Sequence, residues 1–563
     1  MTHEIRIVGE GPAATAAAAA FDDIDAALTD AERPAVSVVV VPAGSGVDVL
    51  DGTHGRVALV EIGGVGGHPI DDLDAAVSVF GSDGPRFADL RRRVAATTDA
   101  DDSPSGDRSA VRFAGAVAGR RAVALLSGDR GVAGTVVEVA GAGVLAERRL
   151  LPVPTPEERD RTVRRDHRDV AVDDALPRAE RALDERIGPI EQVGERESFP
   201  APYYLAGVAD TRGFSDARAA GFAAGVDHDW DRAFMKALGE GLERYCAGVY
   251  RQSEFADAPA RTRSNPVPPS RFVRPDGREP PTADTQIPWV SGTDLATGES
   301  ASLPAAFVHY PPPTEAHKPA ITTGLGLGNS GAEALLSGLY EVVERDATML
   351  AWYSSFEPLE LDLSDEGYDT LRRRARAEEL SVTTLLVTQD IDVPVVAAAV
   401  HRADEWPRFA AGSAASLEPA AAARSALAEA LQNWMELRAM GPEAAAEEGG
   451  AVADYAADPT PAAEFLDPDT TVPAHSVGPA SPPTGRAELD AIVDRVTDAG
   501  LDAYAARTTT RDVASLGFEA VRVLVPAAQP LFQDDPFFGE RARTVPRELG
   551  FEPDLDRAYH PFP

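Results

Sequence analysis

The chain of 563 residues is long enough for two or three domains with sizeable hydrophobic cores, which excludes a small disulfide-stapled scaffold. Its composition, 44% hydrophobic and 26% charged, is that of a globular protein and excludes wholesale disorder. The formal net charge of −38 would repel a polyphosphate backbone, so the composition argues against nucleic acid as a partner.

The beginning of the chain has the pattern of an α/β domain. Ile5–Val8 is predicted to be a short strand, Ala13–Phe21 a helix, and the unbroken apolar run Val36–Val41 a buried parallel strand. Gly9 and Gly11 match the start of a dinucleotide-binding fingerprint. No acidic residue ends the second strand, where one would hold a ribose, so a tight strand-to-helix turn is the favoured interpretation.

Further along, polar and proline-rich segments separate the predicted elements. Thr97–Asp107 is predicted to be an exposed loop, and strands are expected near Ala122–Ser127 and Gly134–Val139. The proline-rich run Leu151–Pro156 breaks regular structure and marks a domain boundary. The charged stretch Glu157–Arg186 that follows it is predicted to be helical.

The sequence therefore divides into a first domain at residues 1–155, a charged helical linker at 156–194 and a second domain at 195–563. In the second domain, long helices that carry acidic residues alternate with apolar strands such as Ser381–Val387 and Val393–His401. The fold class that follows is α/β for both domains.

Two predicted helices carry carboxylates on one face. Glu240 and Glu243 are three residues apart, and Glu333, Glu341 and Glu344 fall within about 80° of one another at 100° per residue. Buried carboxylates repel one another and take up protons unless cations lie between them. Mg²⁺ commonly joins one or two carboxylates to substrate phosphates, so two facing helices of this kind favour a metal–nucleotide site.

Spacing alone leaves a simpler alternative open. Glu243 with Arg244, and Glu344 with Arg345, would also suit surface salt-bridge networks in an acidic protein. Cys246 follows on the first helix, but no neighbouring base is evident, so we expect a buried small residue rather than a catalytic thiol. As the single cysteine, it also excludes an intramolecular disulfide and a tetrathiolate zinc site.

Two further segments have features of a phosphate site. The glycine-rich run Thr322–Asn329 precedes the second helix and could cradle a phosphate with backbone amides. It lacks the Gly-Lys-Ser/Thr ending of a Walker loop, which excludes a P-loop NTPase. The helix Arg424–Gln432 offers a guanidinium for phosphate and a carboxylate for metal, although alone it would pass as an ordinary amphipathic helix.

Taken together, four blocks in this order resemble the YcaO family: Ala237–Tyr245, Gly324–Trp352, Arg424–Gln432 and His560–Pro563. The resemblance implies a YcaO-type α/β domain that follows an E1-like α/β domain, with ATP and Mg²⁺ as cofactors. The positions that match the family's metal-binding carboxylates are Glu240, Glu243, Glu341 and Glu344. The positions that match residues around the nucleotide and its phosphates are Asn329, Glu333, Arg345 and Arg424.

The end of the chain is similar to the proline-rich tail of the azole-forming branch, whose last residues reach the active site. This similarity implies catalytic roles for His560, Pro561 and Pro563. The implied enzyme is an ATP-dependent cyclodehydratase. A Cys, Ser or Thr side chain of a ribosomally made peptide adds to the preceding amide carbon, ATP phosphorylates the amide oxygen, and phosphate leaves to give an azoline, the precursor of a thiazole or oxazole. Phosphorylation is needed because an amide oxygen is a poor leaving group.

Other readings of the resemblance remain open. Thioamidation would use the same activation with an external sulfur donor, and a docking scaffold would bind ATP or a partner without turnover. The expected partners are a peptide or protein substrate, a leader-binding partner protein and a second copy of the chain in a homodimer.

The first domain resembles an E1-like protein that has lost its zinc. Gly84-Pro-Arg-Phe-Ala-Asp-Leu-Arg follows the pattern Gly-Pro-Cys-x-x-Cys-Leu-Arg, but Arg86 and Asp89 replace the two cysteines, and the second pair expected near Leu151–Pro156 is missing too. A glycine-lysine segment that many relatives place before the first glutamate helix reads Gly225-Val-Asp-His-Asp here, and His228 is expected to be structural.

Composition also bears on the cellular environment. Only Lys236 and Lys318 are lysines among 53 basic residues, against 91 acidic ones, a balance that predicts a halophile with a salt-rich cytosol. The sequence shows neither a signal peptide nor a run of about 18 apolar residues, so a cytoplasmic protein without a membrane partner is expected.

Overall fold

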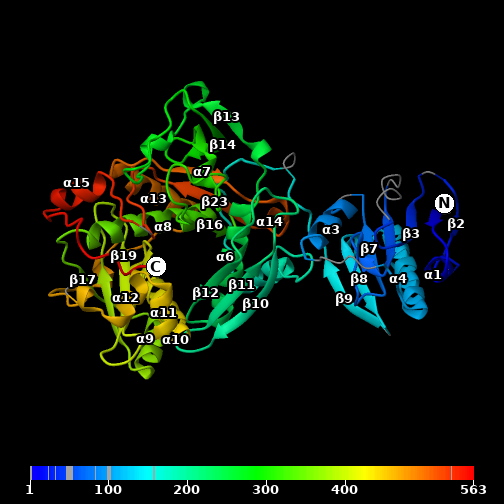
Figure 1. The fold of residues 1–563 in the computed structure, drawn as a ribbon, viewed down its shortest axis with the longest axis horizontal. Helices are drawn as coiled ribbons and strands as arrows, with labels where there is room; N and C mark the ends of the chain where they lie inside the picture. Colours follow the sequence, from blue (N-terminus) through cyan, green and yellow to red (C-terminus); the bar gives the residue numbers. More distant parts are fainter. Residues whose placement is uncertain are drawn as a thin grey trace. The chain divides into compact units, whose positions relative to one another are not determined.

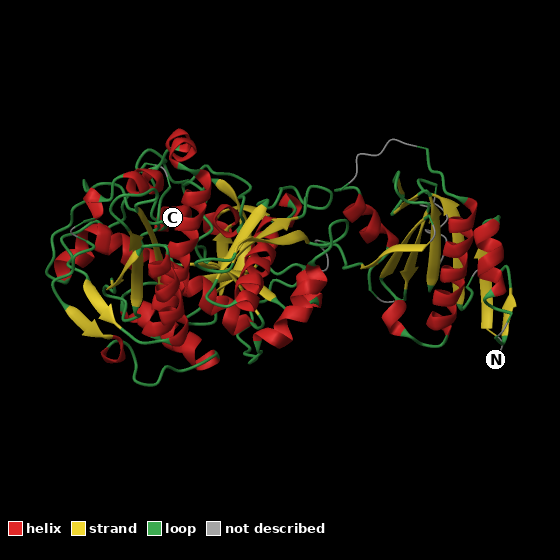
Figure 2. Cartoon of the chain, turned by 90° about the horizontal axis from the view of Figure 1, so that it is seen from below, coloured by secondary structure: helices red, strands yellow, loops and turns green. Residues whose placement is uncertain are grey.

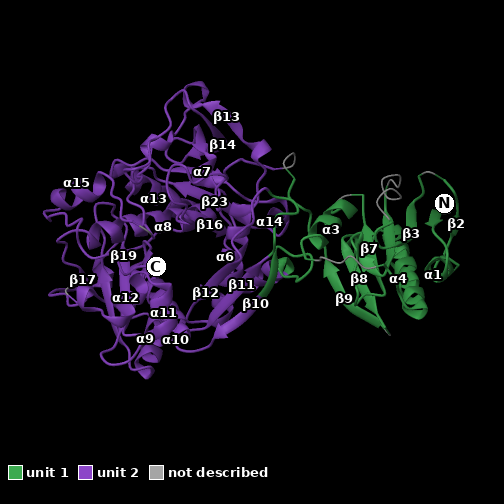
Figure 3. Cartoon of the chain, in the orientation of Figure 1, with its two compact units in different colours: residues 1–158, 181–192, 209–215 green, residues 159–180, 193–208, 216–563 purple. Residues whose placement is uncertain are grey.

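The computed structural model describes the chain except residues 1–2, 23, 32, 46–54, 83, 98–102, 142, 156–158, 464 and 534. The chain forms two compact units (Figure 3), with residues 1–158, 181–192 and 209–215 in the first and residues 159–180, 193–208 and 216–563 in the second. The units alternate along the chain between residues 159 and 216. The domain boundaries at 155 and 194 stay a prediction.

The first unit is built on a seven-stranded sheet in the order β2-β1-β3-β4-β7-β8-β9 (Figure 1). Its strands are β1 (His3–Val8), β2 (Ala26–Leu28), β3 (Val36–Pro42), β4 (Val57–Ile62), β7 (Ala75–Phe80), β8 (Thr135–Ala140) and β9 (Gly143–Arg149). Strands β2, β1, β3 and β4 run parallel, and β7 to β9 continue the sheet antiparallel. The predicted strands at 5–8, 36–41 and 134–139 are confirmed, as is the helix after Gly11, α1 (Pro12–Ala19).

Strand β3 is buried on both faces, as its unbroken apolar run predicts. Val38 and Val40 belong to the core under α1 and α4 (Arg108–Leu126), whereas Val39 and Val41 belong to the core under α3 (Phe87–Val94). Alternate side chains of a strand point to opposite faces, so a strand between two helical layers must be apolar at every position.

The prediction of a strand at Ala122–Ser127 is wrong, because residues 122–126 form the end of the long helix α4. Its small residues recur with helical spacing and pack against α1 so closely that a Cβ on Gly115 would lie 2.2 Å from the carbonyl oxygen of Ala13. A six-residue window of small apolar residues does not distinguish a strand from the end of such a helix. The predicted loop at 97–107 lies partly outside the described residues; residues 103–107 have no helix or strand.

Hydrogen bonds join α3 to residues 151–153, the two regions where the E1-like pattern would have zinc-binding cysteines. The Asp89 carboxylate accepts from the backbone N–H of Arg86 at 2.6 Å and of Val153 at 3.2 Å. The Arg93 guanidinium donates to the carbonyl oxygens of Leu151 at 3.3 Å and Pro152 at 3.4 Å. The residues at these positions are therefore engaged with one another and do not fit a zinc centre.

The charged stretch 157–186 is helical only over α5 (Val172–Ala179) and a short 3₁₀ turn at Glu180–Ala182; the described residues 159–171 have no regular structure. The prediction that this stretch is helical is confirmed for α5 and wrong for residues 159–171, where the arginines reach separate partners. The acceptors of Arg159, Arg161, Arg164, Arg165 and Arg168 include the carbonyl oxygens of Val249, Thr508, Leu295, Asn329 and Gly517 and the carboxylates of Glu254, Glu519 and Asp490. An extended segment can direct successive side chains to such widely spaced acceptors, whereas one helix cannot.

The second unit contains three sheets with helices packed against them (Figure 2). The three-stranded sheet has the order β10-β11-β12, with strands β10 (Ile190–Glu197), β11 (Tyr203–Val208) and β12 (Phe222–Val226). The next has the order β13-β14-β22-β23-β16, with β15 paired to β14, and consists of β13 (Ala256–Pro259), β14 (Gln286–Asp294), β15 (Ser300–Pro304), β16 (Leu325–Gly328), β22 (Tyr504–Arg507) and β23 (Glu519–Leu524). The third has the order β20-β19-β18-β17-β21, with β17 (Leu359–Asp362), β18 (Ser381–Leu386), β19 (Val395–His401), β20 (Phe409–Ala415) and β21 (Thr471–Pro473).

Besides α5, the second unit contains α6 (Trp230–Gly248), α7 (Ala305–Val308), α8 (Gly331–Trp352), α9 (Glu366–Ala377), α10 (Pro419–Met440), α11 (Pro442–Glu448), α12 (Ala451–Ala457), α13 (Arg486–Asp498), α14 (Arg511–Ser515) and α15 (Arg541–Glu548). The strands predicted at 381–387 and 393–401 are confirmed as β18 and β19. In the part of the chain that is described, no helix has both the length and the hydrophobicity needed to cross a bilayer.

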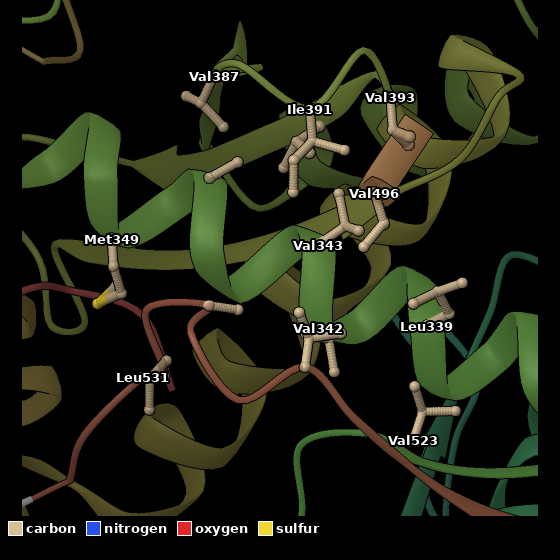
Figure 4. Close-up of a cluster of buried hydrophobic side chains, with 14 of the residues drawn as sticks. Leu339, Val342, Val343, Met349, Val387, Ile391, Val393, Val496, Val523 and Leu531 are labelled. Carbon is tan, nitrogen blue, oxygen red and sulfur yellow. The ribbon is translucent and has the colours of Figure 1, made fainter. Parts of the chain in front are cut away.

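Helix α8 lies at the centre of the second unit's main core. Figure 4 shows Leu339, Val342, Val343 and Met349 of α8 among side chains from several other elements, including Val523 of β23. Burial on most of its surface fixes the rotation of α8, and with it the direction in which each of its polar side chains points.

One buried carboxylate gives the first unit a pH-dependent stability. Glu61 of β4 is 1% exposed and accepts from the backbone N–H groups of Gly66 at 2.7 Å and Gly67 at 2.6 Å. Burial raises its pKa from 4.5 to about 7, although the two hydrogen bonds oppose the shift. Because the folded state binds the proton more tightly than the unfolded state, stability is lost as the pH rises from about 4.5 through 7.

We expect the free energy of unfolding of the first unit to fall by about 3 kcal/mol over this range because of Glu61 alone. Glu61→Gln, which does not ionise, removes this contribution, so calorimetric unfolding of the two proteins from pH 4.5 to 8 gives curves that differ in slope. Parallel curves would contradict the assignment.

Candidate functional site

A cavity of about 550 Å³ lies within the second unit, between helices α6, α8 and α10. The charged side chains that line it are Arg232, Lys236, Glu240, Glu243, Glu333, Glu344 and Glu429. Three of the four predicted metal ligands thus share one cavity. The fourth, Glu341, is not among the described lining residues, and its carboxylate accepts from the backbone N–H of Gly324 at 3.0 Å.

Helix α6 brings two of these glutamates to the cavity. The N-cap residue of α6, Asp229, accepts from the N–H of Arg232 at 3.0 Å. The apolar face of α6 packs against β12, which fixes the position of the helix. Glu240 accepts from the N–H of Ala224 at 2.9 Å and forms an ion pair with Arg244. Burial raises the pKa of Glu243, and the nearby charges of Glu341 and Glu240 raise it further. The facing carboxylates of α6 and α8 are therefore close enough to repel one another.

Helix α8 brings Glu344 to the same cavity. The Glu344 carboxylate accepts from the Ser413 hydroxyl at 2.7 Å, and burial raises its pKa against the opposing charge of Arg345. Glu429 of α10 accepts from the Ser413 N–H at 2.7 Å, and burial raises its pKa too. The Arg345 guanidinium lies 3.5 Å from Glu344 and 3.7 Å from Glu429.

The ion pairs of Arg345 are buried, unlike the surface salt-bridge networks that the sequence alone left open for Glu344 and Arg345. The side chains of Arg345 and Glu344 are only 12% and 11% exposed. A single buried guanidinium, that of Arg345, faces two carboxyl groups, Glu344 and Glu429, whose pKa values are both raised by burial.

Close packing of α8 on β16 explains the glycine-rich run. A Cβ on Gly326 would lie 2.2 Å from the carbonyl oxygen of Ala334, and one on Gly338 would lie 2.6 Å from that of Gly324. Residues 325–328 of the run form β16, which pairs with β23, and of the run only Leu327, Gly328 and Asn329 line the cavity.

Asn329 and Glu333 are held together at the start of α8. The Asn329 backbone N–H and side-chain amide donate to Glu333 at 2.9 and 3.3 Å. The Arg178 guanidinium of α5 donates to the Asn329 side-chain oxygen at 2.5 Å, and Arg168 donates to the Asn329 carbonyl oxygen. These contacts fix the orientation of the amide.

Arg424 is not among the residues that line the cavity; its guanidinium pairs with Asp365 at 2.9 Å, and its neighbour Ser425 and the next turn's Glu429 face the cavity instead. The predicted role of Arg424 at the nucleotide therefore stays a prediction.

The tail reaches the site through one contact. Arg345 donates to the carbonyl oxygen of Pro563 at 3.1 Å. His560 is 2% exposed, its Nε2 lies 2.9 Å from the carbonyl oxygen of Phe532, and burial lowers its pKa to about 4. His560 is thus neutral at pH 7 and, like Pro561 and Pro563, is absent from the described cavity lining. The catalytic roles implied for these three residues stay a prediction.

The carboxylates fit Mg²⁺ only in combination with a substrate. Among the residues that the structure describes, no three His, Cys, Asp or Glu side chains form a ready-made metal site. Mg²⁺ is usually held by one or two carboxylates together with water and phosphate oxygens, so a preformed cage is not required. Buried glutamates with raised pKa values, drawn from facing helices, supply the oxygen ligands and the negative charge that such an ion needs.

Sequence reasoning missed several polar residues that line the cavity or contact its lining residue Asn329. Arg168 and Arg178 lie in the charged stretch that gave no functional signal, and Ser413 lies in an apolar strand. Lys236 was recognisable, because it precedes Glu240 by one helical turn and therefore shares its face.

The family profile for the YcaO cyclodehydratase, an ATP- and Mg²⁺-binding family, matches residues 224–529, which is more than half of the chain. An uncharacterized protein of Methanothermobacter thermautotrophicus is 26% identical over 326 residues, covering 56% of this chain and 83% of its own. A solved heterocyclase in complex with substrate and cofactor matches 100% of this chain and 86% of its own with a TM-score of 0.76 and 18% identity. The heterocyclase TruD matches 97% of this chain and 81% of its own, with a TM-score of 0.65 and 16% identity.

The two structural matches confirm the α/β fold class, and their coverage includes the first unit. The matched segment 224–529 contains α6, α8 and α10, which carry the five cavity glutamates. The chain belongs to the YcaO family and is an ATP-dependent cyclodehydratase with ATP and Mg²⁺ as its cofactors.

Proposed function

We propose that this enzyme activates backbone amides of a ribosomally made peptide and cyclodehydrates Cys, Ser or Thr residues to azolines. The observation that carries the proposal is the gathering of five glutamates from three helices around one cavity, with burial raising the pKa values of Glu243, Glu344 and Glu429. Gathering these carboxylates costs free energy, and binding of metal and phosphate groups would offset that cost.

In this proposal, Glu240, Glu243, Glu341 and Glu344 hold magnesium, and Asn329, Glu333, Arg345 and Arg424 surround the nucleotide. Mg²⁺, when bound, offsets the charge of the transferring phosphoryl group. The chain's own contribution is positional: Glu344 and Glu429 are oriented by Ser413, and Arg345 provides a fixed positive charge between them.

The proposed reaction has three steps: addition to the amide, phosphoryl transfer and elimination of phosphate. The side-chain sulfur or oxygen bonds to the preceding carbonyl carbon and gives up its proton. The former amide oxygen then takes the terminal phosphoryl group of ATP, and ADP leaves. Loss of phosphate, together with the amide proton, forms the C=N bond, so the peptide loses one water for each ring.

The first unit and the tail have proposed roles in the same reaction. We infer that the first unit is a degenerate E1-like domain that no longer binds zinc, and that a separate leader-binding protein presents the peptide. The contact between Pro563 and Arg345 supports a position for the tail beside the transferring group.

Glu344→Gln tests the proposal. The uncharged amide keeps the size of the side chain but removes a metal-binding charge, so we expect peptide-stimulated phosphate release from ATP to fall at least 10- to 100-fold with folding intact. The substrates are unstructured synthetic peptides with internal Cys, Ser and Thr, and mass spectrometry records their products.

Glu357→Gln, at an exposed position of the same unit, is the matched control and should retain full activity. A product one water lighter supports cyclodehydration, and replacement of oxygen by sulfur would instead indicate thioamidation. A wild-type protein that binds MgATP but never modifies or responds to a peptide would favour a docking scaffold.

Arg178→Met tests the support of Asn329. The guanidinium donates to Asn329 and, at 3.2 Å, to the carbonyl oxygen of Gly517, and it lies 4.9 Å from the ring centre of Phe518, which lines the cavity. We expect a loss of about 1.5–3 kcal/mol in unfolding free energy and weaker binding of MgATP, measured by calorimetry.

Arg178→Lys restores the charge but not the forked contacts, so it should recover only part of either quantity. Unchanged affinity for MgATP in Arg178→Met would show that the contacts of Asn329 do not matter for the nucleotide.

A further inference from the structure

Acidic side chains outnumber basic ones in the lining of the cavity. Its lining has five glutamates, and Arg232 and Lys236 are the basic side chains among the lining residues that the structure describes. Both basic residues belong to α6. A nucleoside triphosphate brings further negative charge to such a site, so metal ions and the few cations must offset it.

Of the two basic residues, Lys236 lies closer to the glutamates of α6 and is therefore better placed to bind a phosphate group. It precedes Glu240 by about one turn and Glu243 by about two turns of α6, so all three side chains lie on one face, with a rise of about 5.4 Å per turn along the axis. A phosphate group joined through metal to Glu240 would therefore be next to the Lys236 ammonium on the same face of α6. Arg232 is another turn away, at the beginning of the helix.

Two contacts orient the ammonium of Lys236, and they leave one of its hydrogen-bond donors for a ligand. It donates to the carbonyl oxygen of Val226 at 3.0 Å and to Asp227 at 2.7 Å. An ammonium has three N–H donors, so one remains for a ligand. The side chain is 43% exposed, which leaves it open to the cavity.

Asp227 serves as the anchor for this group of basic side chains. It is 3% exposed, and besides Lys236 it faces His228 at 2.5 Å and Arg232 at 3.7 Å. Strand β12 ends at Val226, directly before Asp227, and contributes no basic residue of its own. The positive charge at this wall of the cavity thus comes from α6.

We propose that Lys236 binds the terminal phosphates of ATP, with Asp227 as the residue that positions it. The inference rests on the proposed nucleotide site and adds a direct phosphate ligand to it. A lysine suits this task because its compact charge on a flexible stem follows a phosphate group as it moves during transfer.

The test compares two probes on Lys236→Met. We expect the dissociation constant of MgATP, measured by calorimetry, to rise about 10- to 100-fold, as for loss of a charged hydrogen bond. The affinity for adenosine, which has no phosphate, should change less than about 2-fold. Lys236→Arg keeps the charge and should recover part of the loss.

Arg261→Met is the matched control, because Arg261 is 61% exposed and pairs with Asp284 on the surface of the same unit. It should bind both probes as the wild type does. If wild type binds MgATP and Lys236→Met binds it equally well, or if both probes lose affinity equally, the inference is overturned. If wild type itself binds no MgATP, the proposed function fails first.

Discussion

Mutual repulsion among buried carboxylates is the constraint on which the second unit depends. Glu243 of α6, Glu344 of α8 and Glu429 of α10 all have pKa values raised by burial, and Arg345 is the guanidinium that lies between the last two. No chain gathers such groups for stability alone, because each unpaired buried charge costs free energy. The arrangement supplies the carboxylate half of the proposed site, and a cationic metal with a phosphate-bearing substrate would supply the other half.

Helix α8 connects this site to the rest of the fold through three consecutive residues. Glu344 faces the cavity, Arg345 contacts Pro563 of the tail, and Asp346 forms a buried ion pair with Arg541 of α15 at 2.6 Å. Because the core around α8 fixes its rotation, the cavity glutamate, the tail contact and the last helix are held in one register. The glycines at 326 and 338 allow this helix to lie directly on β16.

Periodicity could predict the strongly patterned parts of the fold, such as the doubly buried strand at 36–41 and the glutamate faces of α6 and α8. It failed where tertiary contacts decide the structure. The stretch 159–171 is rich in charge and has no helix because its arginines bind acceptors that are far apart in the sequence. The end of α4 has the local pattern of a strand, but it continues a long helix whose small residues pack against α1. In the same way, the spacing placed Glu240, Glu243 and Glu344 together, but no local pattern showed that Arg178 holds Asn329.

The most direct test of this account locates the metal ions themselves. A crystal of the protein grown with Mn²⁺ in place of Mg²⁺ and a non-hydrolysable ATP analogue allows the ions to be placed by anomalous scattering. The account predicts peaks within about 2.5 Å of carboxylate oxygens from both α6 and α8, with analogue phosphates completing the coordination. A nucleotide bound elsewhere, or ions that contact neither helix, would contradict it.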